Sequence, residues 1–224
     1  MLGADLLSLA AHKLHGPRGV AVLFVRRGLQ LAPLVPGHQE RGRRGGTENV
    51  AAAVGMAKAC SLAQASLAEM PKVAALRDLL EERVLAAVPR VVRNGAGPRV
   101  PNTTNLRFDG ADGETLLIGL DLAGISASSG SACSSGAQSP SHVLRAMGLS
   151  AEEAQASLRF SLSRETTSAD VERLLQALPG LVEESRRARS APKSPRTTAA
   201  MASGVPMRSS KCGRSASAKA VADA

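Results

Sequence analysis

The order of predicted elements favours an α/β or α+β fold. Short apolar segments rich in β-branched residues alternate with longer segments rich in Ala and Leu, which is the pattern of strands mixed with helices. The chain has 224 residues and is 44% hydrophobic, so it can bury a core. That apolar fraction excludes a wholly disordered protein.

Two strands are expected near the N-terminus, Leu6–Leu9 and Gly19–Val25, flanking a polar turn at His12–Arg18. The second strand, GVAVLFV, is short, continuous and β-branched, which predicts burial on both faces. A polar stretch rich in Gly and Arg follows from Gly37 to Asn49.

The rest of the ordered chain is predicted to alternate helices and strands. In chain order these are a helix at Glu48–Leu67, a helix at Lys72–Val88, strands at Val91–Arg93 and Thr103–Phe108, a helix at Gly113–Leu122, a strand at Gly124–Ser128, a helix at Ser141–Met147 and a strand at Ser157–Leu162. Pro71 suits the start of the second helix. A last helix, capped by Thr167, Ser168 or Asp170, should reach about Arg187.

The net charge of +9 is concentrated at the C-terminal end. Nine basic residues and one acid lie between Arg186 and Ala224, a charge of +8, which leaves +1 for the first 185 residues. Residues 188–224 are rich in Ser, Ala, Pro and Arg without apolar periodicity, which predicts a disordered basic tail. The charge therefore belongs to an appendage, and nucleic acid is not an expected partner of the globular part.

Composition also narrows the class of protein. The chain has no Trp, no Tyr and 3 Phe, too few aromatic rings for a platform that stacks bases. No apolar run reaches the length of a membrane span, and the N-terminus lacks the pattern of a secretory signal. Three scattered cysteines do not make a disulfide framework or a zinc site, so we expect a cytoplasmic protein without a membrane partner.

Lys13 is the first candidate for chemistry. It lies in the turn AHKLHGPRG between the first two predicted strands, with glycines close behind. A lysine amine with a lowered pKa can form a Schiff base with a carbonyl group. Taken alone, the pattern is more typical of a solvated surface lysine.

A second candidate is the segment GHQERGRRGGTEN, in which Thr47 follows two glycines at a predicted helix start. Backbone N–H groups and a hydroxyl in this arrangement can bind a phosphate, and the neighbouring arginines can add charge-assisted bonds. The alternative is a charged loop in which Thr47 is only a helix cap.

The third candidate is Cys133, which lies within the small-residue run SASSGSACSSGA. Cys60, in contrast, lies within the apolar stretch AVGMAKACSLA and is predicted to be a core residue. A thiolate presented on a loop of small residues can attack a substrate and then move away. The same run is also consistent with a small loop residue that happens to be cysteine.

Together these segments resemble one family, the NifS/IscS-type cysteine desulfurases, which are pyridoxal-phosphate enzymes of the class V aminotransferase group. The matching segments are AHKLHGPRGV, GHQERGRRGGTENVAAAVGMAKA and GISASSGSACSSGAQSPSHVLRAMGLSAEEAQASLRFSLSRETT, and the resemblance extends over residues 3–185. It implies the pyridoxal-phosphate-dependent transferase fold type I. Residues 1–48 would be the end of the large domain, residues 49–187 the small α+β C-terminal domain, and residues 188–224 the tail.

The resemblance also implies roles for five residues. Lys13 matches the lysine that binds the cofactor covalently, and His12 matches its neighbour at the phosphate. Thr47 matches the threonine that reaches the phosphate of the other subunit's cofactor. Cys133 matches the cysteine that takes sulfur as a persulfide, and Arg159 matches the arginine that binds the substrate α-carboxylate.

The implied activity converts L-cysteine to L-alanine and leaves a persulfide on Cys133. Its implied partners are an iron–sulfur scaffold or another sulfur acceptor, and a second copy of the chain in a homodimer. The resemblance implies no resident metal site, and Cys133 at most as a transient iron–sulfur ligand.

The chain departs from the family in several places. The family's chain is roughly twice as long, so this chain is expected to be a truncated C-terminal half. Ala10 stands where the family has a phosphate-binding Ser, and His38 stands where Gly is usual. Two alternatives therefore stay open: a non-catalytic remnant that acts as a sulfur carrier or dimerisation domain, and a selenocysteine lyase.

Overall fold

The computed structural model describes residues 3–129 and 140–190. The chain divides into two units, Met1–Ser190 and Ala191–Ala224. The second unit contains nearly all of the predicted tail and lies outside the described residues.

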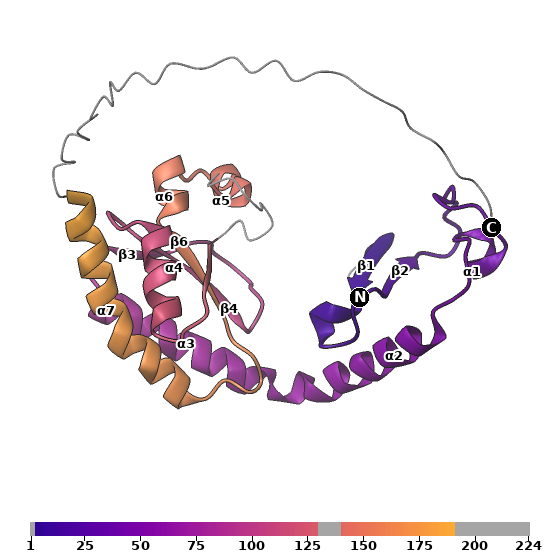
Figure 1. Cartoon of the computed structure of the whole chain (residues 1–224), viewed down its shortest axis with the longest axis horizontal. Helices are drawn as coiled ribbons and strands as arrows, with labels where there is room; N and C mark the ends of the chain where they lie inside the picture. The colour runs from indigo at the N-terminus through magenta and orange to yellow at the C-terminus, as the bar shows by residue number, and fades with distance from the viewer. Residues whose placement is uncertain (1–2, 130–139, 191–224) are drawn as a thin grey trace, which may run out of the picture. The chain divides into compact units, whose positions relative to one another are not determined.

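The N-terminal strands form a hairpin. β1 (Leu6–Ala10) pairs antiparallel with β2 (Ala21–Val25), and Ala10 is opposite Ala21 across the pair (Figure 1). The polar turn between them contains a short 3-10 helix, η1 (Ala11–Leu14). Both predicted strands are thus confirmed, within two residues of their expected ends.

The expected burial of β2 on both faces is wrong. Leu23 is 55% exposed and Phe24 is 50% exposed. Within the described residues, β2 pairs only with β1 in a two-stranded sheet, so no second layer covers its faces. An apolar strand is buried only where other elements pack on it, and its composition does not say whether they are present.

The two long helices form one continuous helical run. α2 (Val50–Ala65) begins at Asn49, whose Oδ1 accepts the N–H of Ala52 at 3.1 Å. The 3-10 turn η2 (Ser66–Glu69) joins it to α3 (Met70–Ala87), and Pro71 lies in the first turn of α3. Both helices are confirmed, although no loop separates them (Figure 1).

This run is long and apolar enough to cross a membrane by length and composition alone. Core helices of soluble proteins pass the same test, so the observation is weak evidence for a span. α3 does bury apolar side chains in a protein core, among them Val73, Leu80 and Val84.

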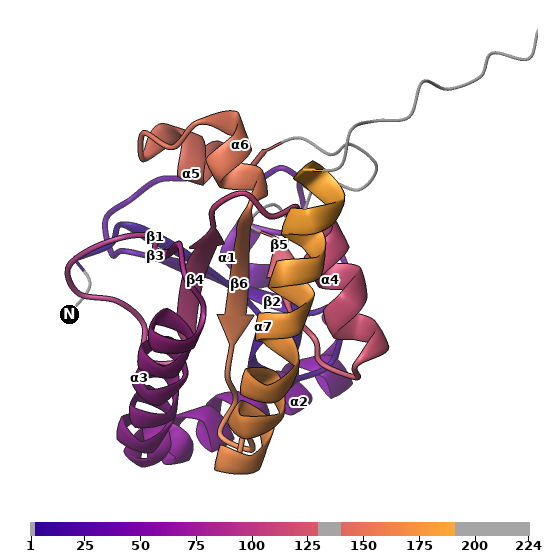
Figure 2. The same ribbon diagram turned by 90° about the vertical axis from the view of Figure 1, so that its left-hand side faces the viewer.

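A four-stranded antiparallel sheet follows. Its strand order is β3 (Val91–Arg93), β4 (Thr103–Phe108), β6 (Ser157–Ser161) and β5 (Ser128–Ser129). The helices α3, α4 (Gly113–Leu122) and α7 (Ser168–Ser190) lie side by side over this sheet (Figure 2).

The sheet has one apolar face and one polar face. Leu106 and Phe108 of β4 and Leu158 of β6 are fully buried or nearly so, within the core formed with the three helices. Because side chains alternate along a strand, Asn105 on β4 and Arg159 on β6 lie on the opposite face, where both are half-buried.

The strand expected at Gly124–Ser128 is shorter and shifted, since β5 contains only Ser128 and Ser129. Gly124 has a positive φ of 72° and ends α4, with its N–H donating to the carbonyl of Asp121. The N–H of Ile125 donates to the carbonyl of Leu120, which completes a Schellman motif. The helix end therefore uses residues that the apolar pattern assigned to a strand.

A short helix after Ser150 was not predicted. After α5 (His142–Ala146), which Ser141 caps, α6 (Ala151–Gln155) begins with a capping box. The N–H of Glu153 donates to Oγ of Ser150 at 3.1 Å, and Oε2 of Glu153 accepts the N–H of Ser150 at 2.7 Å. The sequence SAEE carries this signal, but the helix is too short to show periodicity.

The last helix begins as expected. Oγ1 of Thr167 accepts the N–H of Asp170, and Oδ2 of Asp170 accepts the N–H of Thr167. α7 continues to Ser190, three residues beyond Arg187 and past the residue where the tail was expected to begin.

Candidate functional site

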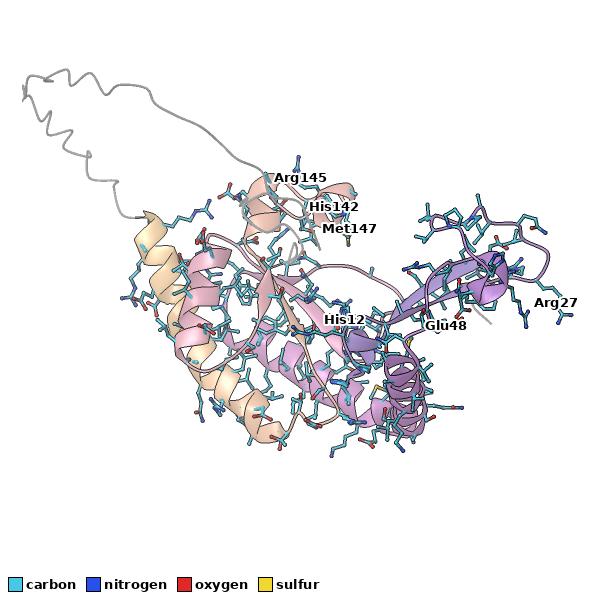
Figure 3. All side chains as sticks on the ribbon, turned by 45° about the vertical axis from the view of Figure 1, so that its right-hand side comes forward. His12, Arg27, Glu48, His142, Arg145 and Met147 are labelled. Atoms are coloured by element: carbon cyan, nitrogen blue, oxygen red, sulfur yellow. The ribbon has the colours of Figure 1, made fainter. Side chains whose placement is uncertain are left out.

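The Lys13 turn is held by backbone hydrogen bonds of the buried Ala11. Its N–H donates to the carbonyl of Val20 at 3.1 Å, and its own carbonyl accepts the N–H of Gly16 at 2.8 Å. His12 and Lys13 are both exposed on η1, and Figure 3 shows His12 there. Within the described residues the Lys13 side chain has no ion pair and no hydrogen bond.

Small residues let this turn approach α2 closely. A Cβ on Gly16 would lie 3.1 Å from the Cβ of Ala59, and a Cβ on Gly55 would lie 2.9 Å from Cγ of Pro17. Larger side chains at these positions would push the turn away from the helix. The glycines that accompany Lys13 therefore position the turn against α2.

The glycine-rich loop before α2 has its own backbone requirements. A Cβ on the buried Gly45 would lie 2.2 Å from the carbonyl oxygen of Pro36, so only glycine fits there. Gly46 has a φ of 106°, and its N–H donates to Oε1 of Gln39 at 3.2 Å. Gln39 begins a short helical segment, α1 (Gln39–Gly42), that the sequence did not predict. The loop is thus fixed on both sides of the glycine pair.

Thr47 follows this glycine pair and is exposed. Asn49, not Thr47, caps α2, so the alternative reading of Thr47 as a helix cap is wrong. In the described part of the chain the Thr47 hydroxyl has no hydrogen-bond partner. Figure 3 shows its neighbour Glu48 on the same loop.

Thr47 lines a hollow of about 680 Å³ between the hairpin, the glycine-rich loop and α2. The same hollow is lined by Arg44, Met56 and Cys60, whereas neither Lys13 nor His12 contributes to it. The structure thus keeps the Lys13 turn and the Thr47 loop at separate places.

Cys60 is exposed, which corrects its prediction as a core residue. The apolar residues around it in the sequence lie on a helix that is largely uncovered within the described residues, as the exposed Val54 and Leu62 show. Arg44 and Cys60 were not among the predicted site residues. Arg44 could have been found from its place in the Gly/Arg-rich stretch, but nothing in the sequence marks Cys60.

Arg159 lies on the polar face of the four-stranded sheet, between two neighbouring strands. It is opposite Asn105 on β4 and opposite Ser128 on β5. Its Nε is buried and has no hydrogen-bond partner in the described part of the protein. A buried donor without a partner costs free energy unless a ligand or water satisfies it.

Cys133 lies outside the described residues, in the segment 130–139. That segment follows β5 directly, and β5 is the strand whose Ser128 pairs with Arg159. On its other side the segment is joined to Pro140, next to the buried cap residue Ser141. The segment with Cys133 is therefore joined in sequence to the strand that pairs with Arg159.

Known proteins resemble this chain over most of its length. A cysteine desulfurase of Klebsiella pneumoniae is 50% identical over 184 residues, which is 81% of this chain and 46% of the relative. Cysteine desulfurase 2 of Trichormus variabilis gives the same identity and coverage. The chain thus spans about half the length of the curated relatives that it matches.

A solved structure supports the same relation. A NifS-like protein from Rickettsia africae ESF-5 superposes with a TM-score of 0.71 at 35% identity, covering 81% of this chain and 48% of the other. The expected fold class, an α/β fold of the type I pyridoxal-phosphate enzymes, is confirmed over the part of that fold that the chain spans. The resemblance to cysteine desulfurases is confirmed as well. Residues 1–174 match the family model of the class-V aminotransferases, and the chain belongs to that family.

Proposed function

We propose that this chain supplies half of a cysteine desulfurase, which converts L-cysteine to L-alanine and takes the sulfur on Cys133. The observation that carries the proposal is the relation between Arg159 and β5. Arg159 has an unpartnered buried Nε, and the strand beside it leads directly into the segment with Cys133. A substrate held by its carboxylate at Arg159 would therefore lie near the start of the segment that carries the sulfur acceptor.

The described residues suit pyridoxal phosphate in two respects. Lys13 offers an exposed amine with no ion pair, which can condense with the cofactor's aldehyde. Thr47 offers a hydroxyl with no protein partner beside two glycines and Arg44, which suits a phosphate. His12 would contact the phosphate near Lys13. When bound, the cofactor supplies an electron sink for the carbon atoms of the substrate.

The sulfur step is balanced without an added oxidant. The Cys133 thiolate attacks the substrate sulfur, so a sulfur–sulfur bond forms while the carbon–sulfur bond of L-cysteine breaks. The carbon keeps the electron pair and gains a proton, which gives alanine. The sulfur leaves as a persulfide on Cys133, ready for transfer to an iron–sulfur scaffold or another acceptor thiol.

The other half of the enzyme would bind against the exposed surface of the hairpin and α2. Leu23, Phe24, Val50 and Val54 are each at least half exposed there. Apolar patches of this kind mark interaction surfaces. We propose that the portion of the family fold not spanned by this chain covers them, and that the assembled enzyme is a homodimer in which Thr47 reaches the other subunit's cofactor.

Pyridoxal phosphate added to the purified chain is expected to label Lys13. Reduction with borohydride followed by peptide mass spectrometry should find the cofactor on Lys13, and Lys13→Ala should remove that adduct. Lys58→Ala is a matched control, because Lys58 is an exposed lysine on the neighbouring helix α2. Equal labelling of Lys13 and Lys58 would contradict a specific cofactor site.

One observation favours a second candidate, a sulfur carrier without its own catalysis. The chain covers only 46% of the length of a cysteine desulfurase relative. We expect alanine formation from L-cysteine when the chain is mixed with the portion of a relative that it does not span. Alanine formation that stays at background, while Cys133 still accepts a persulfide from a donor enzyme, would favour the carrier instead.

A further inference from the structure

The guanidinium of Arg159 lies on the polar face of the sheet without a protein partner in the described part of the chain. Its buried Nε has no acceptor, and no carboxylate among residues 3–129 and 140–190 forms an ion pair with its guanidinium. A guanidinium can bind a carboxylate with two parallel hydrogen bonds. A carboxylate has more acceptor sites than those two bonds occupy, so a second donor nearby could also bind it.

Asn105 is placed to be that donor. It is directly opposite Arg159 across the β4–β6 pair, on the same face of the sheet, where it is half-buried. Side chains directly opposite each other in an antiparallel pair have Cβ atoms about 5 Å apart. A ligand carboxylate bound to one of them is therefore within reach of the other.

A chain of hydrogen bonds decides which end of the Asn105 amide is free. Oγ of Ser157 donates its single hydrogen to the carbonyl of Glu153 at 2.7 Å, so it can only accept from Asn94. The Asn94 atom at 2.9 Å from it must then be the amide nitrogen, Nδ2. The same Nδ2 lies 2.6 Å from Asn105 and must donate there, so the Asn105 atom that it meets is the oxygen, Oδ1.

The Asn105 amide is consequently oriented so that its oxygen accepts a hydrogen bond from Asn94 and its nitrogen is left to donate elsewhere. Within the described residues nothing accepts from Nδ2 of Asn105. Two hydrogen-bond donors without a partner among the described residues, the Arg159 guanidinium and the Asn105 amide NH₂, thus lie on adjacent strands. Both are donors only, which suits an anion and not a cation.

We infer that Asn105 is a second carboxylate-binding residue, which donates from Nδ2 to the α-carboxylate held by Arg159. Asn94 and Ser157 are positioning residues, because their hydrogen bonds keep the Asn105 nitrogen turned away from Asn94. The inference rests on the proposed function, in which Arg159 binds the carboxylate of an amino acid. It adds a residue from the neighbouring strand that sets how that carboxylate is oriented.

The test uses the ¹⁵N-labelled full chain and the Nε–H resonances of its arginines, with the Arg159 signal assigned by its loss in Arg159→Lys. L-alanine should shift the Arg159 Nε–H signal saturably, whereas alaninamide, which lacks the carboxylate, should not. Asn105→Ala should raise the apparent Kd for L-alanine about tenfold, the effect of one hydrogen bond to a charged group. Asn105→Asp should abolish binding, because it places a carboxylate of nearly the same shape against Arg159.

Thr103→Ala is the matched control, since Thr103 is half-buried on the same strand and face. It should leave the Kd within a factor of two. A Kd that is unchanged in both Asn105 variants, with the Arg159 signal still responding to L-alanine, would overturn the role of Asn105 and leave the proposed function standing. An Arg159 signal that does not respond to L-alanine in the unaltered chain would overturn both.

Discussion

Replacing Cys133 by alanine is expected to abolish sulfur transfer while leaving cofactor labelling of Lys13 intact. Only the thiolate can form the sulfur–sulfur bond, and alanine has no atom that replaces it. The measurement combines this chain with the portion of a relative that it does not span, supplies L-cysteine, and traps protein persulfides by alkylation before mass spectrometry. The alkylated persulfide should map to the peptide with Cys133 and should be absent from Cys133→Ala.

Cys60→Ala is the control for this experiment. Cys60 is exposed on α2 and lines the hollow beside Thr47, so a non-specific persulfide would form there as readily. We expect Cys60→Ala to retain both the Cys133 persulfide and alanine formation. Sulfur transfer that survives Cys133→Ala and is lost in Cys60→Ala would assign the acceptor role to Cys60 and refute the role of Cys133.

Most elements of the fold could be predicted because their signals are local. The strand at Thr103–Phe108 and the helix at Gly113–Leu122, which has an acid in its first turn, were both placed at their observed ends. Gly124 was misread, since a glycine C-cap and a short strand both follow an apolar helix. Exposure was harder to predict. Phe24 and Cys60 lie in apolar sequence, and their exposure depends on which elements pack against them.

The site residues were accessible to sequence reasoning only through the family resemblance. Lys13 alone looks like a surface lysine, and its exposed place on η1 does not distinguish it from one. The orientation of the Asn105 amide is set by Asn94 and Ser157, which are 11 and 52 residues from it in the chain. Hydrogen bonds between segments so far apart leave no local pattern in the sequence.

A charged cluster around the buried Glu81 supports the sheet on which Arg159 lies. Glu81 of α3, with a side chain only 9% exposed, accepts hydrogen bonds from Arg99 at 2.6 Å and from Thr104 at 2.7 Å. Arg93 of β3 is a third donor residue, at 3.1 Å. Burial alone would raise the pKa of Glu81, but these hydrogen bonds outweigh it and hold the pKa below its ordinary value. One carboxylate thus joins α3, β3 and β4.

Glu81→Gln is expected to lower the free energy of unfolding by about 2 to 3 kcal/mol at pH 7, because it leaves Arg99 and Arg93 without their shared anion. A carboxyl whose pKa is lower in the folded state stabilises the protein above its unfolded pKa, and this stability is lost as the pH falls through the folded pKa. The unaltered chain should therefore lose stability below about pH 5 more steeply than Glu81→Gln. Denaturant titrations at several pH values measure both effects.

Glu82→Gln is the control variant. It distinguishes the loss of the Glu81 cluster from the general effect of removing one negative charge from α3. Glu82 is the next residue along the helix and is exposed, so its replacement should change the free energy of unfolding by less than about 0.5 kcal/mol. Glu82→Gln should also lose stability below about pH 5 as steeply as the unaltered chain does. Equal losses in the two variants at pH 7 would mean that the cluster does not hold α3 to the sheet. If Glu81→Gln lost stability with falling pH as steeply as the unaltered chain, the protonation of Glu81 would not be the cause of that loss.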